Sequence, residues 1–425
     1  MNIRRIIRLF VTCPFLCFFP VYSQSNIWSL EDCIRHATEH NISIQQLKIQ
    51  KEVAEIDLNT SQMKRLPNLN ATVEQRWNFG RTQIQSGLYE NQTQSNTVFS
   101  IGSSIPLFTG FRISNEIARN RLELQAAVQN LEKAKENLAL NVASLFLQVL
   151  FNKEILKIHE EQLALSQLQV ERTQALVNEG KVPSSQLYDM EAQVANERVS
   201  FIQADNNLKL SLLDLTQSLE LEQNLTFDIY TAEVIDDQIN EYMNNTQSSA
   251  SIFDKAVQDR PLIKEQEYKL ESYKRMLKIA KSDYYPTLNL FMSFGLNYFY
   301  IYAKNAQNAP FSSQLKNNMG ENIGLNLNIP IFNRLSTRNQ VKNAKLNIEN
   351  QQLIVNNTKK TLYKEIETAY LNALSAQEKY HASGLAVKAT SESLQYAKER
   401  YETGKSSVFE FSEAKTRLVK SQSEE

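Results

Sequence analysis

The feature that most constrains this chain is a stretch without glycine or proline, from residue 111 to residue 179. As one uninterrupted helix it would extend about 100 Å. Only 10 glycines and 9 prolines occur in 425 residues, which favours long helices over a loop-rich enzyme. Apolar residues recur at the seven-residue spacing of a coiled coil, so the helix must pack against equally long partners. The heptad residues are Ile117, Leu124, Leu131, Leu138 and Leu145.

The sequence contains this unit twice. A shift of 224 residues carries Ile105-Pro106-Leu107-Phe108 onto Ile329-Pro330-Ile331-Phe332 and Gly180-Lys181 onto Gly404-Lys405. The second half keeps the heptad as Val341, Ile348, Val355, Leu362 and Ala369. We therefore expect an internal two-fold repeat.

The repeat defines the expected domain organisation. Residues 1–23 are a signal peptide, 24–222 the first repeat, 223–250 an equatorial connector and 251–425 the second repeat. Each repeat holds a helix, two strands and a long helical hairpin, and the connector holds one short strand at Thr226–Tyr230. The sequence ends at Glu425, which corresponds to Phe201, so we expect a last helix roughly twenty residues shorter than its counterpart.

Each repeat changes from helical spacing to period two before its long helix. Helical spacing runs from Trp28 to Arg65 and ends at Pro67. Alternating apolar and polar residues then predict long strands at 69–79, 288–300 and 323–329, and the strand pairs flank polar loops at 81–96 and 303–321. Such strands suit an outer-membrane barrel with lipid outside and water inside. Four strands cannot close a barrel, because the smallest need about eight, so we expect several copies to share one; a trimer would supply twelve strands.

The N-terminus has the pattern of a cleaved secretory signal. Three basic residues, Arg4, Arg5 and Arg8, precede an apolar segment that is too short to span a bilayer. Cleavage leaves 43 basic and 47 acidic residues, so the mature chain lacks the excess of basic residues that is typical of nucleic-acid binding. It also leaves Cys33 as the one cysteine, so no disulfide can form within the chain. No later segment has the roughly 18 apolar residues that a membrane-spanning helix needs.

One short motif suggests metal chemistry. His36-Ala37-Thr38-Glu39-His40 fits the H-x-x-E-H pattern of some zinc peptidases, in which two imidazoles lie one helical turn apart. Nothing nearby suggests a substrate cleft, and such residues near a helix end are more often solvated surface. We therefore predict no catalytic residue, no metal site and no cofactor.

Taken together, these features resemble the outer membrane efflux protein family. The resemblance rests on the duplicated order of helix, strand, loop, strand and long helix, on both Ile-Pro motifs and on the Gly-Lys pairs at 180–181 and 404–405. It implies a fold that is mainly α with membrane β: a long coiled-coil α-helical barrel and a shared 12-stranded outer-membrane β-barrel, four strands per protomer in a trimer. It further implies an export duct in the outer membrane of a Gram-negative bacterium that extends into the periplasm. The implied partners are a periplasmic adaptor protein, an inner-membrane transporter and outer-membrane lipid.

The resemblance also implies a channel gate at the helix tips. The family narrows to an iris there, and its acidic positions correspond to Glu410 and Glu413, with Asp189 as the candidate in the first repeat. Glu410 and Glu413 share one helix face, so threefold symmetry would give rings of three carboxylates, which favour cations. Gly180, Lys181, Gly404 and Lys405 mark the helix-tip turns where an adaptor would dock, and both glycines are expected in the left-handed conformation.

Two expectations concern departures from the family. Tyr401 matches a tyrosine that latches the closed iris, but the partners offered here are Gln186, Ser185 and Ser406, so we expect a weaker or rearranged latch. Asn333-Arg334 follows the second Ile-Pro motif where the family often has glycine, so we expect that turn to differ from the first.

Two other functions fit part of the sequence. A structural coiled-coil surface protein would explain the heptads, but not the alternating strands at matched places in both halves. A passive porin-like channel would explain the strands, and dependence on an adaptor would separate it from an export duct.

Overall fold

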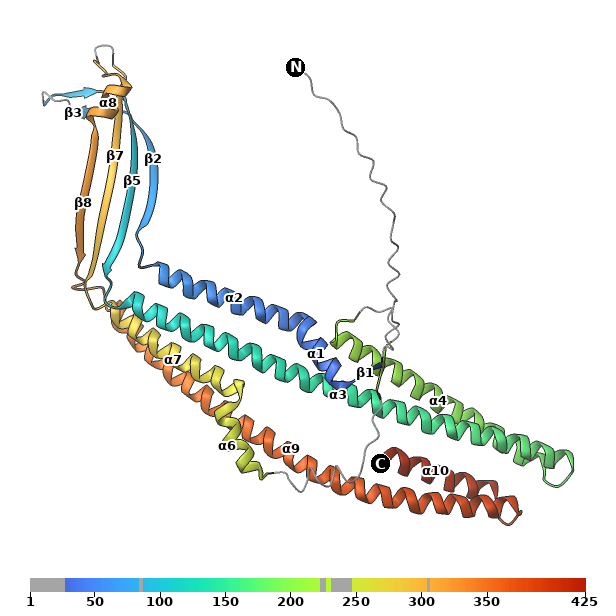
Figure 1. The fold of residues 1–425 in the computed structure, drawn as a ribbon. Helices are drawn as coiled ribbons and strands as arrows, with labels where there is room; N and C mark the ends of the chain where they lie inside the picture. The colour runs from blue at the N-terminus through green and yellow to red at the C-terminus, as the bar shows by residue number, and fades with distance from the viewer. Residues whose placement is uncertain (1–26, 84–86, 222–226, 231–246, 304–305) are drawn as a thin grey trace, which may run out of the picture.

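The computed structural model describes residues 27–83, 87–221, 227–230, 247–303 and 306–425. In this part of the chain the fold is mainly α, as expected. Figure 1 shows an elongated molecule, with a sheet at one end and long helices running away from it. The expected signal peptide at 1–23 and most of the connector lie outside the described residues.

The four long strands form one antiparallel sheet with the order β2-β5-β7-β8. The strands are β2 (Asn68–Asn78), β5 (Gln94–Phe108), β7 (Thr287–Ile301) and β8 (Met319–Asn328). Strands from the two halves of the sequence therefore pair at the centre, where Ile101 of β5 lies opposite Phe294 of β7. This confirms the strand predictions and leaves β2 and β8 at the two edges.

The register of the sheet sorts its side chains onto two faces. One row across the strands holds Leu69, Ser103, Met292 and Ile323, and the next row on that face holds Ala71, Ile101, Phe294 and Glu321. The opposite face carries rows such as Asn70, Gly102, Ser293 and Asn322. The sheet thus has an apolar face, with Glu321 as an exception near the start of β8, and a polar face.

The two segments expected to be polar loops contain secondary structure. Between β2 and β5, β3 (Arg81–Gln83) pairs with β4 (Tyr89–Asn91). Between β7 and β8, the short helix α8 (Phe311–Asn317) packs against β7. Polar composition predicted exposure correctly for most of these residues but missed this local order.

The first helical segment is two helices rather than one. α1 (Leu30–His40) ends at Asn41, and α2 (Ile42–Met63) begins after it. The Asn41 side chain accepts a hydrogen bond from the Ser43 amide and donates one to the Ser218 carbonyl. The asparagine side chain thus pairs with backbone groups that have no partner within a helix, at the end of α1 and the start of α2. It interrupts the helix at Asn41, although the apolar spacing continues.

Both long helices form as expected. α3 (Arg112–Asn178) and α9 (Ser336–Glu402) have 67 residues each. Each long helix ends in a tight turn, the helix tip, after which the chain returns as α4 (Ser184–Ser218) or α10 (Val408–Glu424). The two helical hairpins are thus α3–α4 and α9–α10. α6 (Ser249–Asp259) leads into α7 (Pro261–Ser282), which packs between α3 and α9. Heptad residues lie in these seams: Ile117, Leu131, Val355 and Leu362 are buried, whereas Ala369 is exposed.

A compact core surrounds the middle of α3. Val142 and Val149 are fully buried, together with Cys33 of α1 and Leu215 of α4. The parallel pair of β1 (Ile27–Trp28) and β6 (Asp228–Ile229) closes this core, which places a short strand in the connector as expected. α3 also contains an 18-residue window of mean hydropathy 1.2, apolar enough to cross a membrane by length and composition, with 17% of it buried. The expectation that no segment after the signal has enough apolar residues for such a helix is therefore wrong for α3.

The turns that lead into the two long helices have the same backbone conformation. Gly110 and Phe111 have φ angles of 61° and 67°, and Arg334 and Leu335 have 56° and 61°. The expectation that the second turn differs is therefore wrong. Arg334 adopts the left-handed conformation without glycine, at a cost of about 1 kcal/mol.

Candidate functional site

The helix tips lie at the end of the molecule opposite the sheet (Figure 1). Gly180 and Gly404 have φ angles of 70° and 71°, which confirms the expected left-handed turns. The amides of Lys181 and Lys405 reach back to the carbonyls of Leu176 and Arg400, so both helices end in the same hydrogen-bonded turn. The side chains of Lys181 and Lys405 are exposed.

The acidic gate candidates lie on helices that start at these tips. Ser407 caps α10 by accepting a hydrogen bond from the Glu410 amide. Glu410 and Glu413 are both exposed, and the Glu410 carboxylate lies 3.6 Å from the Arg400 guanidinium of α9. Asp189 is exposed on α4 of the other hairpin. The structure thus places these carboxylates at the tip of a single chain, without a contact between them among the described interactions.

Tyr401 has other partners than the sequence suggested. Its ring stacks on Phe411 at a centroid distance of 5.4 Å, and its hydroxyl lies 3.4 Å from Thr173 Oγ1 of α3. Within one chain these contacts differ from the candidate partners Gln186, Ser185 and Ser406, and the weaker or rearranged latch stays a prediction. The reason is spatial: the tyrosine faces the end of the first long helix, and Thr173 is 1% exposed there.

An ion pair joins the ends of the two long helices near Tyr401. The Arg172 guanidinium of α3 lies 2.6 Å from the Glu402 carboxylate of α9. Arg172 and Thr173 are neighbours, so α3 contributes two adjacent side chains to the contact between the hairpins. The pair is half-exposed, and such pairs typically contribute less than about 1 kcal/mol.

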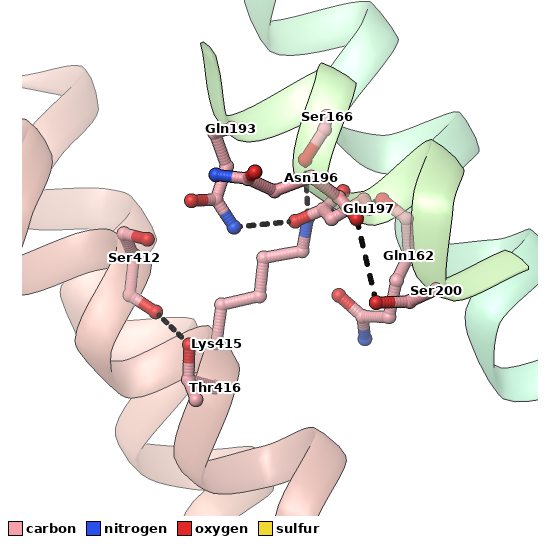
Figure 2. A network of polar contacts seen from close by, with 9 residues as sticks. All are labelled: Gln162, Ser166, Gln193, Asn196, Glu197, Ser200, Ser412, Lys415 and Thr416. Carbon is pink, nitrogen blue, oxygen red and sulfur yellow. Dashed lines mark hydrogen bonds and ion pairs between the residues drawn. The ribbon is translucent and has the colours of Figure 1, made fainter. Parts of the chain in front are cut away.

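A buried lysine also joins the two hairpins. Lys415 of α10 is 3% exposed and extends between α3 and α4, as Figure 2 shows. Its ammonium group donates to the Gln162 carbonyl at 3.0 Å, to Ser166 Oγ and to Glu197 Oε1 at 2.8 Å. A lysine has three donors. All three therefore bind acceptors on the other hairpin.

The charges of this network are taken out of water. Burial lowers the pKa of Lys415, while its hydrogen bond to Glu197 and the carboxylate charge act in the opposite direction. Gln193 also donates to Glu197 Oε1, at 2.8 Å. Glu197 Oε2 has no hydrogen-bond partner in the part of the chain that the structure describes. The network thus pairs one positive charge with one negative charge, but it leaves one carboxylate oxygen of Glu197 without a hydrogen bond among the described residues.

The seam of α3 changes character toward the tip. Its buried positions are apolar near the middle, for example Val142 and Val149, and polar beyond residue 160. Side-chain oxygens of Gln162 and Gln169 are buried and lack partners among the described residues. Buried amides without partners weaken packing relative to an apolar seam. The buried polar residues are Gln162, Ser166, Gln169 and Thr173.

Sequence reasoning missed Lys415, although a signal was present. Lys415 occupies a core-spaced position between Phe411 and Leu418, at steps of four and three residues. A lysine at such a position must be buried or must interrupt the apolar face. Its partners could not be identified, since Glu197 is 218 residues away.

The zinc-like motif has a local explanation. The rings of His36 and His40 stack at a centroid distance of 4.1 Å, and Trp28 packs edge-on against His36 at 5.0 Å. His40 Nδ1 lies 3.0 Å from the His36 carbonyl, and Glu39 is exposed. Among the described residues, no group of three or more histidine, cysteine, aspartate or glutamate side chains could hold a metal ion.

Comparisons with solved structures identify similar folds. The Campylobacter jejuni CmeC outer membrane channel is similar with a TM-score of 0.77 and 17% identity, covering 94% of this chain and 81% of that one. The open state of the Neisseria gonorrhoeae MtrE outer membrane channel is similar with a TM-score of 0.72 and 16% identity, covering 93% and 84%. At these identities the similarity shows the fold.

Sequence comparison identifies the family. Outer membrane protein TolC of Salmonella enteritidis is 20% identical over 203 residues, which is 45% of this chain. The match spans 41% of that protein's length. The family model for outer membrane efflux proteins matches residues 33–220 and 252–425, most of the chain. This protein therefore belongs to the outer membrane efflux protein family.

Proposed function

We propose that this protein is the outer-membrane duct of an export system and works as a homotrimer. The observation that carries the proposal is the four-stranded sheet with two open edges, β2 and β8. Its apolar face suits lipid and its polar face suits a water-filled lumen. An open sheet edge is not tolerated in lipid, because its amides and carbonyls would lack partners. Pairing β8 with β2 of the next copy removes both edges, and three copies give twelve strands.

The long helices support the same assembly. Leu140, Leu147 and Phe151 of α3 are 63%, 60% and 52% exposed in the single chain. Leu346 and Leu353 of α9, also seven residues apart, are 54% and 62% exposed. Apolar residues at heptad spacing on an uncovered face are typical of helices that pack against further helices. Neighbouring protomers would supply these helices and close an α-helical barrel.

The internal repeat is part of this proposal. The equal lengths of α3 and α9, their matched left-handed entry turns and their matched glycine tips support two repeats at 24–222 and 251–425, joined by an equatorial connector. A signal peptide at 1–23 would direct the chain out of the cytoplasm. Six such units in a trimer would give a barrel of near sixfold symmetry.

The helix tips would form the periplasmic gate. Under threefold symmetry Glu410 and Glu413 give stacked rings of carboxylates, Asp189 adds a third ring, and Tyr401 helps to hold the hairpins together. The exposed turns at Gly180-Lys181 and Gly404-Lys405 would receive a periplasmic adaptor, which links the duct to an inner-membrane transporter. Such a duct positions charges around a path and performs no bond chemistry, so we assign no catalytic residue, metal or cofactor.

Planar-bilayer conductance tests the gate. The wild-type channel is expected to favour cations and to be blocked by a trivalent cation added from the periplasmic side, because the carboxylates concentrate negative potential. Glu410→Gln with Glu413→Gln should remove the block and reduce the cation preference. Glu39→Gln, on the distant helix α1, is the matched control and should change neither. A double variant as selective and as blockable as wild type would place the gate elsewhere.

Native mass spectrometry in detergent tests the assembly. The proposal requires a trimer that keeps its β-structure. A stable monomer with the full β-signal would contradict the shared barrel, because one chain would then satisfy its own strand edges.

A further inference from the structure

The central strand β7 extends beyond its partner β8. The pairing with β8 ends at Leu296, whereas β7 continues to Ile301. On its other side, β7 pairs with β5 over this whole extension, up to Ile301 opposite Gln94. In the part of the chain that the structure describes, no strand therefore lies beside one edge of the last residues of β7. Such an edge exposes backbone groups that could pair with another chain.

Three side-chain amides take the place of the missing strand. The amide group of Asn318 donates to the Asn297 carbonyl at 2.9 Å. The Gln314 side chain accepts from the Phe299 amide at 3.0 Å and donates to the Phe299 carbonyl at 2.9 Å. Asn308 makes the same two-way contact with Ile301, at 2.8 and 2.9 Å.

These contacts fix the segment that carries α8. Gln314 lies within α8 and is 3% exposed, so its two hydrogen bonds to the Phe299 backbone of β7 are shielded from water. Its amide also donates to the Ala309 carbonyl at 2.9 Å, which ties the start of the segment to its middle. α8 is thereby held beside β7 in line with β8, as Figure 1 shows.

The fixed helix presents one aromatic side chain on the apolar face of the sheet. Phe311 is 51% exposed, and its ring packs edge-on against Tyr298 at a centroid distance of 5.0 Å. Tyr298 has the same orientation in β7 as Leu296 and Phe294, since strand residues two apart share a face. Phe311 therefore lies on the side of the sheet that the proposed function assigns to lipid.

The apolar face changes composition at this level. Along β7 it carries Leu288, Leu290, Met292, Phe294 and Leu296, and then Tyr298 and Tyr300, and Tyr302 follows directly after the strand. Tyr300 and Tyr302 pack together at 4.8 Å, and the register places Trp77 in the same row as Tyr300. Side chains without a polar group are thus followed by tyrosines, whose aromatic rings carry a hydroxyl. This sequence matches the transition from hydrocarbon to the headgroup region of a bilayer.

We propose that α8 is a lipid-interface anchor, with Phe311 inserted at the headgroup boundary of the outer leaflet and Gln314 as the residue that positions it. The occupant is a lipid surface, because the exposed side chains are amphipathic aromatics continuous with the lipid-facing rows. The proposal rests on the proposed membrane barrel. It adds that a segment between the strands, rather than the strands alone, fixes the depth of the barrel.

Single-tryptophan fluorescence with brominated lipids tests the anchor. The chain has two tryptophans, Trp28 and Trp77, so Phe311→Trp in a Trp28→Phe, Trp77→Phe background reports on one site. The trimer is placed in phosphatidylcholine vesicles with bromines either near the headgroups or near the chain ends. We expect headgroup-side bromines to quench this tryptophan at least about twofold more than chain-end bromines. Equal quenching at both depths, or stronger quenching from the chain ends, would contradict an interfacial position.

Two controls separate the anchor from the barrel. A variant that keeps only Trp77 should be quenched, since Trp77 lies on a strand of the proposed barrel, and one that keeps only Trp28 should not. Quenching of Trp77 without quenching at position 311 overturns the anchor and leaves the barrel intact. No quenching at either position overturns the membrane barrel itself.

The role of Gln314 has its own variant. Gln314→Leu keeps the size of the side chain but removes the contacts with Phe299. Quenching at position 311 should fall or lose its depth preference, while quenching of Trp77 in the matched variant stays unchanged. Unchanged quenching at position 311 would show that Gln314 does not position the anchor. If the Gln314→Leu chain fails to insert, Asn308→Leu and Asn318→Leu test the same strand completion.

Discussion

Lys415 Nζ lies 2.8 Å from Glu197 Oε1, and this ion pair joins hairpins that are 218 residues apart in sequence. Lys415→Met should leave the Glu197 carboxylate buried without its cation and destabilise the contact between hairpins by about 3 kcal/mol. The loss of stability is measured by hydrogen exchange, in which the α10 amides of Lys415→Met should exchange faster than those of the wild-type protein. Adding Glu197→Leu should restore most of the protection, because two apolar side chains can replace a buried ion pair.

The exposed pair of Arg400 and Glu410 is the matched control for that prediction. Arg400→Met should change exchange in α10 little, because solvent already screens this pair. An equal loss of protection in Arg400→Met and Lys415→Met would show that burial of Lys415 adds nothing.

The second prediction concerns the left-handed turn at Arg334. Arg334→Gly should raise the free energy of unfolding by about 0.5–1 kcal/mol, since glycine adopts φ of 56° without the Cβ penalty but loses more chain entropy. Urea denaturation of the detergent-solubilised protein measures the change. The opposite exchange, Gly110→Ala, should destabilise by more than about 2 kcal/mol, because its Cβ would lie 2.6 Å from the Ser282 carbonyl. A destabilising Arg334→Gly would mean that the arginine side chain stabilises the turn.

The third prediction concerns acid sensitivity at Glu265 of α7. Its carboxylate is 3% exposed, 2.6 Å from Lys133 of α3 and 2.5 Å from Lys269. Burial raises its pKa, but hydrogen bonds and charges of the two lysines outweigh burial and hold the pKa below 4.5. The folded pKa is thus depressed. Its contribution to stability is therefore present above about pH 4.5 and is lost as pH falls through the folded pKa.

Urea midpoints between about pH 3 and 7 check this dependence. Glu265→Gln should lower stability at pH 7 and flatten the profile at the acidic end. Glu267 lies on α7 as well and forms a half-exposed pair with Lys359 of α9, so Glu267→Gln should leave the profile nearly unchanged. A wild-type profile that is flat below pH 4.5 would contradict the assignment.

The fourth prediction concerns packing on the polar face of the sheet. Phe291 and Gly324 are opposite each other in β7 and β8, and a Cβ on Gly324 would lie 2.5 Å from the Phe291 ring. Gly324→Ala should therefore displace the ring and destabilise the protein by about 1–2 kcal/mol. Gly320→Ala, in the same strand with nothing within 4 Å, should be neutral or stabilising. Thermal unfolding of both variants distinguishes the clash from a general effect of alanine in β8.

The sequence alone determined the parts of this protein that depend on short-range periodicity. Heptad spacing identified both α3, which lacks glycine and proline, and α9, which contains the single glycine Gly384, because a helix of this kind is specified within each seven-residue step. Period-two alternation identified β2, β7 and β8. The tip glycines were predictable because only glycine adopts the left-handed conformation at no cost. The family followed from the order and duplication of these local signals.

Only the tertiary structure decided how distant elements meet. Asn41 ends α1 with help from the Ser218 carbonyl, and the Tyr401 hydroxyl lies beside Thr173, a neighbour that the sequence did not indicate. Arg334 is left-handed because the turn before α9 requires it. The sequence shows Lys415 as a charged residue within an apolar helix face, but it does not show that Glu197 is the ion-pair partner. A periodic pattern shows which face of a helix or strand is buried. The residues that pack against that face are set by tertiary packing between segments about 200 residues apart in the sequence.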